Sequence, residues 1–340
     1  MDYYNPNGNN AQQYYANAQW EAYYRLKRDE ERRSLITTGV LFGAAIISYL
    51  IIQTIIVAVL MYSPFYEKYQ NSAVFQNCFN VLAVHMSSML VPFGLLALIK
   101  KKSFEGKPLV PLKKLGFVKT AAWVSLGMGC CLAANFVTNF VIILFRQGGY
   151  ELSQPEMLKT DSPLACITLI VATAIVPAIF EEFAFRCCAL GVLRRYGKGF
   201  SVVAVSIVFG LIHGNLIQFI FAFIIGLILG YITVHTDSVL PAMLIHGFNN
   251  GLSVIQEIAE YLGSAEAGEL ITGAIFFVWG ALAVIGLIYL CIKKQFKRES
   301  KPVSEPFALS FGAKLLCLLP GLALPIIILI ILTMQFVKPI

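Results

Sequence analysis

Long apolar runs constrain the fold of this chain more than any other feature of its sequence. The hydrocarbon core of a bilayer, about 30 Å thick, needs about 20 apolar residues when a helix crosses it at about 1.5 Å per residue. Runs of that length lie near 36–62, 76–99, 120–145, 163–190, 216–235, 239–261, 270–292 and 313–337, with a shorter run at 200–213. The sequence therefore predicts an all-α polytopic membrane protein with about eight or nine transmembrane helices.

The composition agrees with a membrane protein and excludes several other classes. Hydrophobic residues make up 58% of the chain and charged residues only 13%. None of the eight cysteines has CxxC spacing, and all lie in or beside apolar segments, which favours free buried thiols over a disulfide framework or a zinc site. In a membrane protein the net charge of +7 is explained by basic residues in the loops between helices, so no nucleic-acid partner is predicted.

The basic residues predict the orientation in the membrane. With the N-terminus inside, the cytoplasmic stretches hold the five Lys and Arg of the N-terminal tail, the seven between Lys100 and Lys119, the three after the fourth helix and the six between Lys293 and Lys314. The other side holds four. Because cytoplasmic loops carry the excess of Lys and Arg, we predict an integral protein of the plasma membrane with a cytoplasmic N-terminus.

Regions of different composition flank the apolar part. Residues 1–34 are rich in Asn, Gln and Tyr and lack the apolar segment of a secretory signal, so they are predicted to be a disordered cytoplasmic tail. A tail that binds a partner or lipid is the alternative. The membrane domain is predicted over 35–292, followed by a basic cytoplasmic linker at 293–312 and an additional C-terminal transmembrane helix within 313–340.

The stretch FEEFAFR, residues 180–186, places two carboxylates and an arginine inside a membrane helix. Charges there are costly and usually functional. Glu182 and Arg186 are four residues apart and share a helix face, whereas Glu181 points about 100° away. One carboxylate can neutralise the arginine, and the other is left for general acid or base work. An ionic clamp between helices, formed by all three residues, is the alternative.

Polar residues in two further helices reach the same depth as this stretch. At about 1.5 Å per residue, Glu181 lies about 20 Å inside Arg194, His213 about 21 Å inside Gly199 and Asn250 about 18 Å inside Ser238. His246 shares a helix face with Asn250, four residues away. Uncompensated polar groups are expensive in lipid, so these side chains are expected to face one another around a water-filled cavity. His85 and His235 are interpreted as packing residues.

Glutamate, two histidines and an asparagine in a wet cavity suit the hydrolysis of a peptide bond. A carboxylate with an imidazole can orient and deprotonate water, and a second imidazole with an amide N–H can stabilise the oxyanion. The sequence offers no serine beside a base, and Cys187 and Cys188 lack an evident one. Water is therefore the predicted nucleophile.

Three short motifs carry a resemblance to a known family. EEFAFR matches EExxxR, FGLIH matches FxxxH and HGFNN matches HxxxN, and they occur in the family's order. In these motifs the chain resembles the CPBP family, the CAAX proteases and bacteriocin-processing enzymes, which includes the Ras-converting CAAX endopeptidase. The resemblance covers about 164–255, which we take as the CAAX-protease-like motif core.

The resemblance implies a role for each motif residue. Glu181 would be the catalytic base, aided by His213, and His246 with Asn250 would form the oxyanion site. Glu182, Arg186 and Phe209 would support them. The resemblance also implies a cavity that opens toward the cytoplasm, and a protein or peptide substrate at the membrane.

The resemblance also favours a metal-free mechanism. Glu181, His213 and His246 have the composition of a two-histidine, one-carboxylate zinc site. The histidines come from separate helices, however, and the residue four positions after His246 is Asn250, a poor zinc ligand. No cofactor is predicted, and zinc is disfavoured.

The predicted function is thus an intramembrane endopeptidase that uses a glutamate-activated water. One alternative is a protein of the same fold that acts as a non-proteolytic scaffold or bacteriocin self-immunity protein. The other is a transporter whose Glu, Arg and His side chains line a permeation path; the GxxxG pairs at 226–230 and 247–251 would then lie at a moving interface, although close helix packing explains them in any case.

Overall fold

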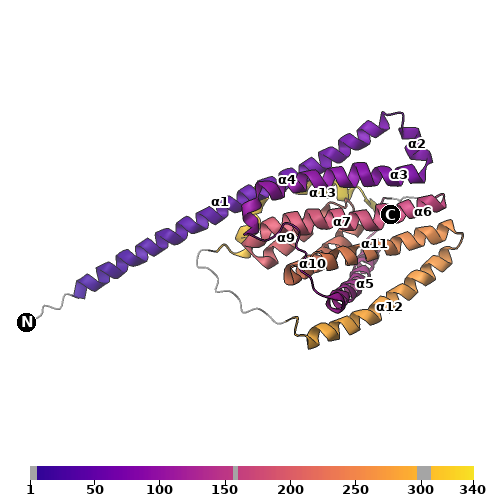
Figure 1. The fold of residues 1–340 in the computed structure, drawn as a ribbon. Coiled ribbons are helices and arrows are strands. Elements are labelled where there is room, and N and C mark those ends of the chain that lie inside the picture. Colours follow the sequence, from indigo (N-terminus) through magenta and orange to yellow (C-terminus); the bar gives the residue numbers. More distant parts are fainter. Residues whose placement is uncertain (1–5, 156–159, 297–307) are drawn as a thin grey trace, which may run out of the picture.

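A computed structural model describes residues 6–155, 160–296 and 308–340 as a helical bundle (Figure 1). Its α-helices are α1 (Pro6–Met61), α2 (Tyr66–Asn71), α3 (Ala73–Phe79), α4 (Ser87–Ile99), α5 (Phe117–Gln147), α6 (Pro163–Leu169), α7 (Val176–Glu182), α8 (Leu190–Leu193), α9 (Lys198–Leu211), α10 (Leu216–Thr236), α11 (Leu240–Tyr261), α12 (Ala265–Ile292) and α13 (Phe311–Met334). The remaining elements are the π-helical segments η1 (Asn80–Met86), η3 (Ile170–Ile175) and η4 (Phe183–Ala189), the 3₁₀ turns η2 (Lys101–Phe104) and η5 (Arg194–Tyr196), and the strands β1 (Tyr150–Leu152) and β2 (Val337–Pro339).

The predicted polytopic membrane fold is confirmed. Each of the nine apolar runs forms helix, and seven helices among the described residues are long and apolar enough to cross a membrane. One of the seven joins α3, η1 and α4, and another continues from α6 to η5. The other two runs correspond to α9, which has only 14 residues, and to α11, whose 22 residues include the polar HGFNN stretch. The chain is therefore an integral membrane protein.

The N-terminal region differs from the predicted disordered tail. From Pro6 it is helical and continuous with the first apolar run, so that α1 projects well beyond the bundle (Figure 1). Charged side chains one turn apart support this helix: Lys27 Nζ lies 2.9 Å from Glu30 Oε2, and Arg25 Nη2 lies 3.6 Å from Glu21 Oε2. Two aromatic side chains also meet along it, because Tyr24 stacks on Trp20. Residues 1–5 lie outside the described part of the chain, as do 297–307 of the predicted linker.

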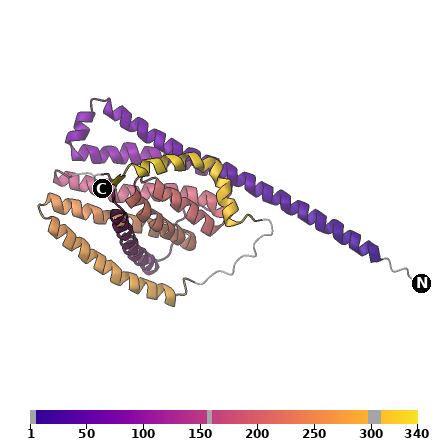
Figure 2. The same ribbon diagram turned by 180° about the vertical axis from the view of Figure 1, so that it is seen from behind.

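The C-terminal helix packs on the N-terminal one. The helix predicted within 313–340 is α13, and it runs along α1, as the view from behind shows (Figure 2). At their crossing a Cβ atom on Gly39, Gly43 or Gly321 would collide with the backbone of the facing helix. Gly39 and Gly43 form a GxxxG pair, and small residues of this kind let two membrane helices approach closely.

The connections divide the bundle into two ends. What we call the basic end carries the connections 100–116, 194–198 and 237–239, which contact one another: Lys113 N donates to Asp237 O and Val239 N to Pro111 O. The opposite end carries the connection after α5 and the C-terminus, because β1 pairs with β2 there. The long apolar helices run between these ends.

Candidate active site

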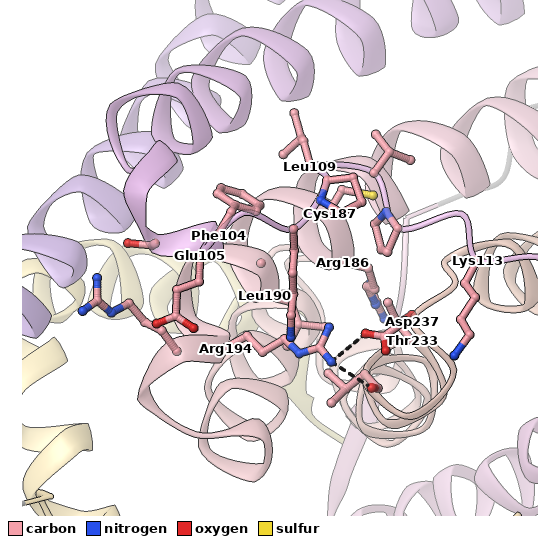
Figure 3. Close-up of a pocket in the computed structure, with 18 of the residues that line it drawn as sticks. Phe104, Glu105, Leu109, Lys113, Arg186, Cys187, Leu190, Arg194, Thr233 and Asp237 are labelled. Atoms are coloured by element: carbon pink, nitrogen blue, oxygen red, sulfur yellow. Dashed lines mark hydrogen bonds and ion pairs between the residues drawn. The ribbon is translucent and has the colours of Figure 1, made fainter.

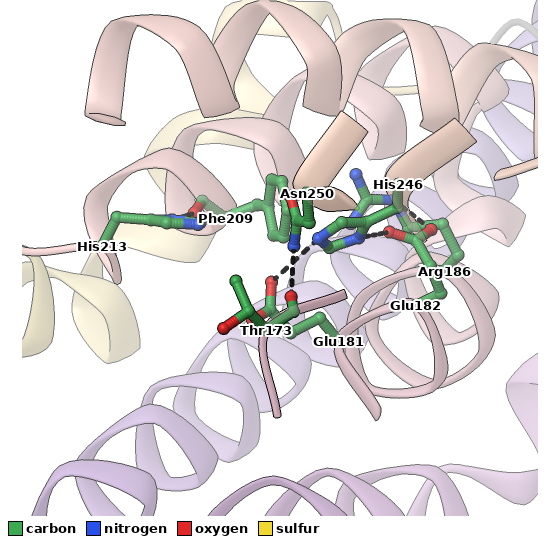
Figure 4. Close-up of polar contacts among 8 residues, drawn as sticks. All are labelled: Thr173, Glu181, Glu182, Arg186, Phe209, His213, His246 and Asn250. Carbon is green, nitrogen blue, oxygen red and sulfur yellow. Dashed lines mark hydrogen bonds and ion pairs between the residues drawn. The ribbon is translucent and has the colours of Figure 1, made fainter. Parts of the chain in front are cut away.

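The motif residues meet between three helical segments. Glu181 and Glu182 end α7, Arg186 follows in η4, Phe209 is in α9, and His246 lies in α11 (Figure 4). All five are at most 7% exposed. The three motifs, separate in the sequence, therefore form one buried polar cluster.

Glu182 is bound from two sides. Arg186 Nε lies 3.1 Å from Glu182 Oε2, so the ion pair predicted from the i,i+4 spacing is present. His246 Nδ1 lies 2.9 Å from the other oxygen, Oε1, and donates a hydrogen bond to it. Glu182 thus does more than neutralise Arg186: it also fixes the orientation of the imidazole.

His246 stands between the two carboxylates. Its Nε2 lies 3.8 Å from Glu181 Oε2, while Nδ1 is held by Glu182 (Figure 4). In a neutral ring that donates through Nδ1, Nε2 carries the lone pair and faces Glu181. Glu181 Oε2 is buried and accepts no hydrogen bond from any described residue. Glu181 is accordingly the carboxylate left over, in agreement with the helix geometry of the sequence.

The contacts of Phe209 explain why the FxxxH motif begins with an aromatic residue. Its ring lies under the Arg186 guanidinium, with Cζ 4.1 Å from the ring centroid, and edge-on to the rings of His246 and His213, at centroid distances of 6.0 and 5.2 Å. A cation over an aromatic face is stabilised, more strongly where water is excluded. Phe209 therefore holds the arginine and both imidazoles in place.

His213 lies apart from the carboxylates. Its Nδ1 is 2.8 Å from the carbonyl oxygen of Phe209, one helical turn earlier. A carbonyl can only accept, so Nδ1 is the protonated nitrogen and Nε2 is left as an acceptor in the neutral ring. No hydrogen bond or ion pair within the described part of the chain joins His213 to Glu181, and Figure 4 shows the ring away from the cluster.

Asn250 is held by a backbone defect that a proline creates. Its Nδ2 donates to the carbonyl oxygen of Thr173, at 3.1 Å. In an α-helix this carbonyl would receive the N–H of residue 177, but Pro177 has none. The segment is π-helical at this point, as helices at functional sites often are. An amide nitrogen carries two hydrogens, so the second N–H of Asn250 stays available.

All four predicted catalytic residues line one cavity. It has a volume of about 910 Å³, and Glu181, His213, His246 and Asn250 all contribute to its wall. The rest of the polar lining consists of Asn80, His85, Asn135, Thr138, Asn139, Gln154, Thr173, Gln218, Asn249, Ser253, Gln256 and Thr272. His213 therefore shares the space in front of Glu181 although it does not contact it.

The cavity extends away from the basic end. Buried Leu229 lines its floor toward that end, whereas exposed Gln154 and Gln256 line it near the opposite end. These positions favour an opening at the end opposite the basic loops. The cytoplasmic N-terminus and the side of the membrane on which the cavity opens stay predictions.

Within the described ranges, no group of three or more His, Cys, Asp or Glu side chains is arranged to hold a metal ion. The two histidines of the zinc site considered from the sequence bind different groups. His213 Nδ1 binds the Phe209 carbonyl oxygen, and His246 Nδ1 binds Glu182. A metal-free mechanism stays a prediction.

Comparison with known proteins identifies the region around these residues. Residues 163–252 match the model of the family described as type II CAAX prenyl endopeptidase Rce1-like. The match contains all seven motif residues and confirms the resemblance that the motifs indicated. No curated protein and no solved structure matches the chain.

Proposed function

We propose that this chain, whose residues 163–252 match the Rce1-like CAAX endopeptidase family, hydrolyses peptide bonds within the membrane with a water molecule activated by Glu181. At the level of the family, the match supports a CAAX-protease-like intramembrane endopeptidase. The observation that carries the mechanism is the array of Glu181, His246 and Glu182 beside a polar cavity of about 910 Å³. We expect the Glu181→Gln variant to lose peptide cleavage, and a cleavage assay of the purified variant tests this.

Glu181 is the proposed general base. Its Oε2 has no hydrogen-bond donor among the described side chains, so the oxygen is free to accept a proton from water in the cavity. His246 Nε2, 3.8 Å away, is near enough to share that water but too far for a direct hydrogen bond. Glu182 and Arg186 act by positioning His246, since they do not themselves line the same cavity wall.

His213 is proposed to act on the water or the leaving group across the cavity. Its protonated Nδ1 is occupied by the Phe209 carbonyl, which leaves Nε2 as an acceptor. An acceptor at this place can hold the water that Glu181 deprotonates, or receive a proton and pass it to the departing amine. This keeps His213 in the role of assistant to Glu181 without contact between the two side chains.

Asn250 is proposed to stabilise the oxyanion. Its second N–H points to no described acceptor, and the first is fixed by Thr173. Asn250→Ala is expected to lower kcat about 10²- to 10³-fold, the usual cost of losing one oxyanion donor. Steady-state cleavage by the purified variant checks this. Asn249→Ala, the neighbouring asparagine, is the matched control and should lose far less; an equal loss in both would remove the oxyanion role.

The substrate is proposed to enter from the end opposite the basic loops. A cysteine at Gln256 should then react with a membrane-impermeant thiol reagent in the vesicle orientation that protects a cysteine at Lys113. Both residues are exposed, at opposite ends of the bundle. The unsubstituted protein provides the background, since Cys78 and Cys291 are exposed. Labelling of both positions from one side would contradict the direction of the cavity.

Chelation tests the metal-free mechanism. Purified protein is expected to carry no stoichiometric zinc, and dialysis against a strong chelator should leave most of the activity, because a carboxylate base needs no Lewis acid. Elemental analysis and activity before and after dialysis are the measurements. Activity that vanishes on chelation and returns with Zn²⁺ alone would make His213 and His246 ligands instead.

A further inference from the structure

A second pocket, of about 640 Å³, lies at the basic end and is separate from the cavity of the active site (Figure 3). Residues 103–113 cover it as a strap. One side of the strap is fixed by Val239 N, which donates to Pro111 O at 2.8 Å, and the other by Phe104, whose ring packs where a Cβ atom on Gly191 would lie. The pocket is thus built by defined contacts of the strap.

Positive charge dominates the lining. Six basic side chains, Lys107, Lys113, Arg186, Arg194, Arg195 and Lys198, stand against the carboxylates of Glu105 and Asp237. Asp237 is already bound to Arg194, at 2.7 Å. Burial and the nearby charge of Arg195 together lower the pKa of Lys100, next to the strap. The excess of basic side chains over carboxylates favours binding of an anionic ligand.

Arg186 contributes buried donors that nothing in the described protein satisfies. It is 2% exposed, and Nη1 and Nη2 both lack a hydrogen-bond acceptor, while Nε is bound to Glu182. Arg194 Nε is buried and unpaired in the same way. Unpaired buried donors are costly, and the planar guanidinium fits the oxygens of a phosphate. Figure 3 shows the Arg186 side chain among the residues that line this pocket.

The same pocket has an apolar wall. Phe104, Leu109, Val110, Leu112 and Leu190 line it. A ligand that fits both walls carries a phosphate and a hydrocarbon chain. The basic end is predicted to face the cytoplasm, where basic pockets between membrane helices bind the headgroups of acidic lipids. We propose that this pocket binds an acidic phospholipid, with its phosphate on the arginines and one acyl chain along the strap.

Arg186 joins this pocket to the active site. Its guanidinium lies between the lipid pocket and Glu182, which in turn orients His246. A phosphate on the free nitrogens of Arg186 would leave the Glu182 ion pair in place and add acceptors on its other side. The bound lipid is therefore expected to stabilise the protein itself, whether or not the chain is a protease.

Lipid titration of the purified full-length protein in a neutral detergent tests the proposal. Phosphatidylglycerol should raise the Tm and appear as a one-to-one adduct in native mass spectrometry, whereas phosphatidylcholine with the same acyl chains should do neither. The variant Lys113→Gln/Arg195→Gln, two exposed residues of the pocket, should bind phosphatidylglycerol about tenfold or more weakly, since each basic residue near a lipid surface contributes about 1 kcal/mol.

The matched control is Lys101→Gln/Lys102→Gln. It removes the same charge from the same end, and neither residue lines the pocket. It should bind phosphatidylglycerol as the unsubstituted protein does. An equal loss of binding in the control pair would show that general surface charge, not the pocket, attracts the lipid. An equal response to phosphatidylcholine would show that binding needs no anionic headgroup. Equal binding of glycerol 3-phosphate would show that binding needs no acyl chain. Each of these results would overturn the proposal.

Discussion

Glu181→Gln is expected to reduce peptide cleavage by about 10²- to 10⁴-fold, the usual contribution of a general base. Glutamine keeps the shape of the side chain and cannot accept a proton from water. Among the described residues Glu181 makes no ion pair shorter than its 3.8 Å approach to His246, so the folded yield and the Tm should stay close to those of the unsubstituted protein. Cleavage in proteoliposomes and thermal unfolding of the same preparation measure the two effects.

Glu260→Gln is the control for this change, because Glu260 lies exposed near the end of α11 and away from the cluster. It should leave both activity and Tm unchanged. A Glu181→Gln protein that unfolds early but retains its activity per folded molecule would favour the ionic clamp over the catalytic base.

Glu182→Gln is expected to lower stability as well as activity. The change leaves Arg186, 2% exposed, without its ion-pair partner, and breaking a buried pair from one side costs about 3–5 kcal/mol. It also replaces the carboxylate that fixes His246 Nδ1 with a neutral amide. The Tm and the folded yield should fall clearly below those of Glu181→Gln, and cleavage per folded molecule should fall too.

A double variant separates the two roles of Glu182. In Glu182→Gln/Arg186→Met no unpaired charge remains, and a neutral pair of similar volume often restores stability. The Tm should therefore recover while cleavage stays low, since His246 still lacks its carboxylate. Recovery of both would make Glu182 a structural partner of Arg186 only, and recovery of neither would assign the loss to packing.

The helices of this fold could be predicted because their signal is local. Apolar runs of spanning length fix the segments, and all nine became helices. Where the Asn, Gln and Tyr of the N-terminal region predicted a disordered tail, residues 6–34 form part of α1, and the charged pairs at 21–30 support that helix. Contacts between distant segments are harder to predict. For the contact of α1 with α13, the GxxxG spacing of Gly39 and Gly43 was the one signal in the sequence.

The members of the candidate site could also be predicted, but not all of their partners. The spacing of four residues correctly paired Glu182 with Arg186. It gave no indication that His246 would turn to Glu182, or that His213 would bind the Phe209 carbonyl, because both depend on how α7, α9 and α11 pack. The partner of Asn250 had a signal that was missed: Pro177 leaves the carbonyl four residues earlier, that of Thr173, without its helical donor.

The direction of the cavity needed the structure. Loop charges are a property of the sequence, whereas the position of a cavity along the bundle depends on which helix ends its lining residues occupy. Gln154 lies outside the three helices along which depth was counted, and Gln256 lies in α11 but beyond Asn250, where the count along that helix ended. The expected opening toward the cytoplasm came from the family resemblance alone.

The most direct test of the central claim compares peptide termini in membranes that contain equal amounts of the unsubstituted protein or of Glu181→Gln. Mass spectrometry of newly formed C-termini should find a set of cleavages, within or beside membrane segments, that is present with the unsubstituted protein and absent with the variant. The same set should reappear when the unsubstituted protein is added to membranes that carry the variant. Identical termini in both membranes, with both proteins folded, would contradict a Glu181-dependent endopeptidase and favour a non-proteolytic protein of the same fold.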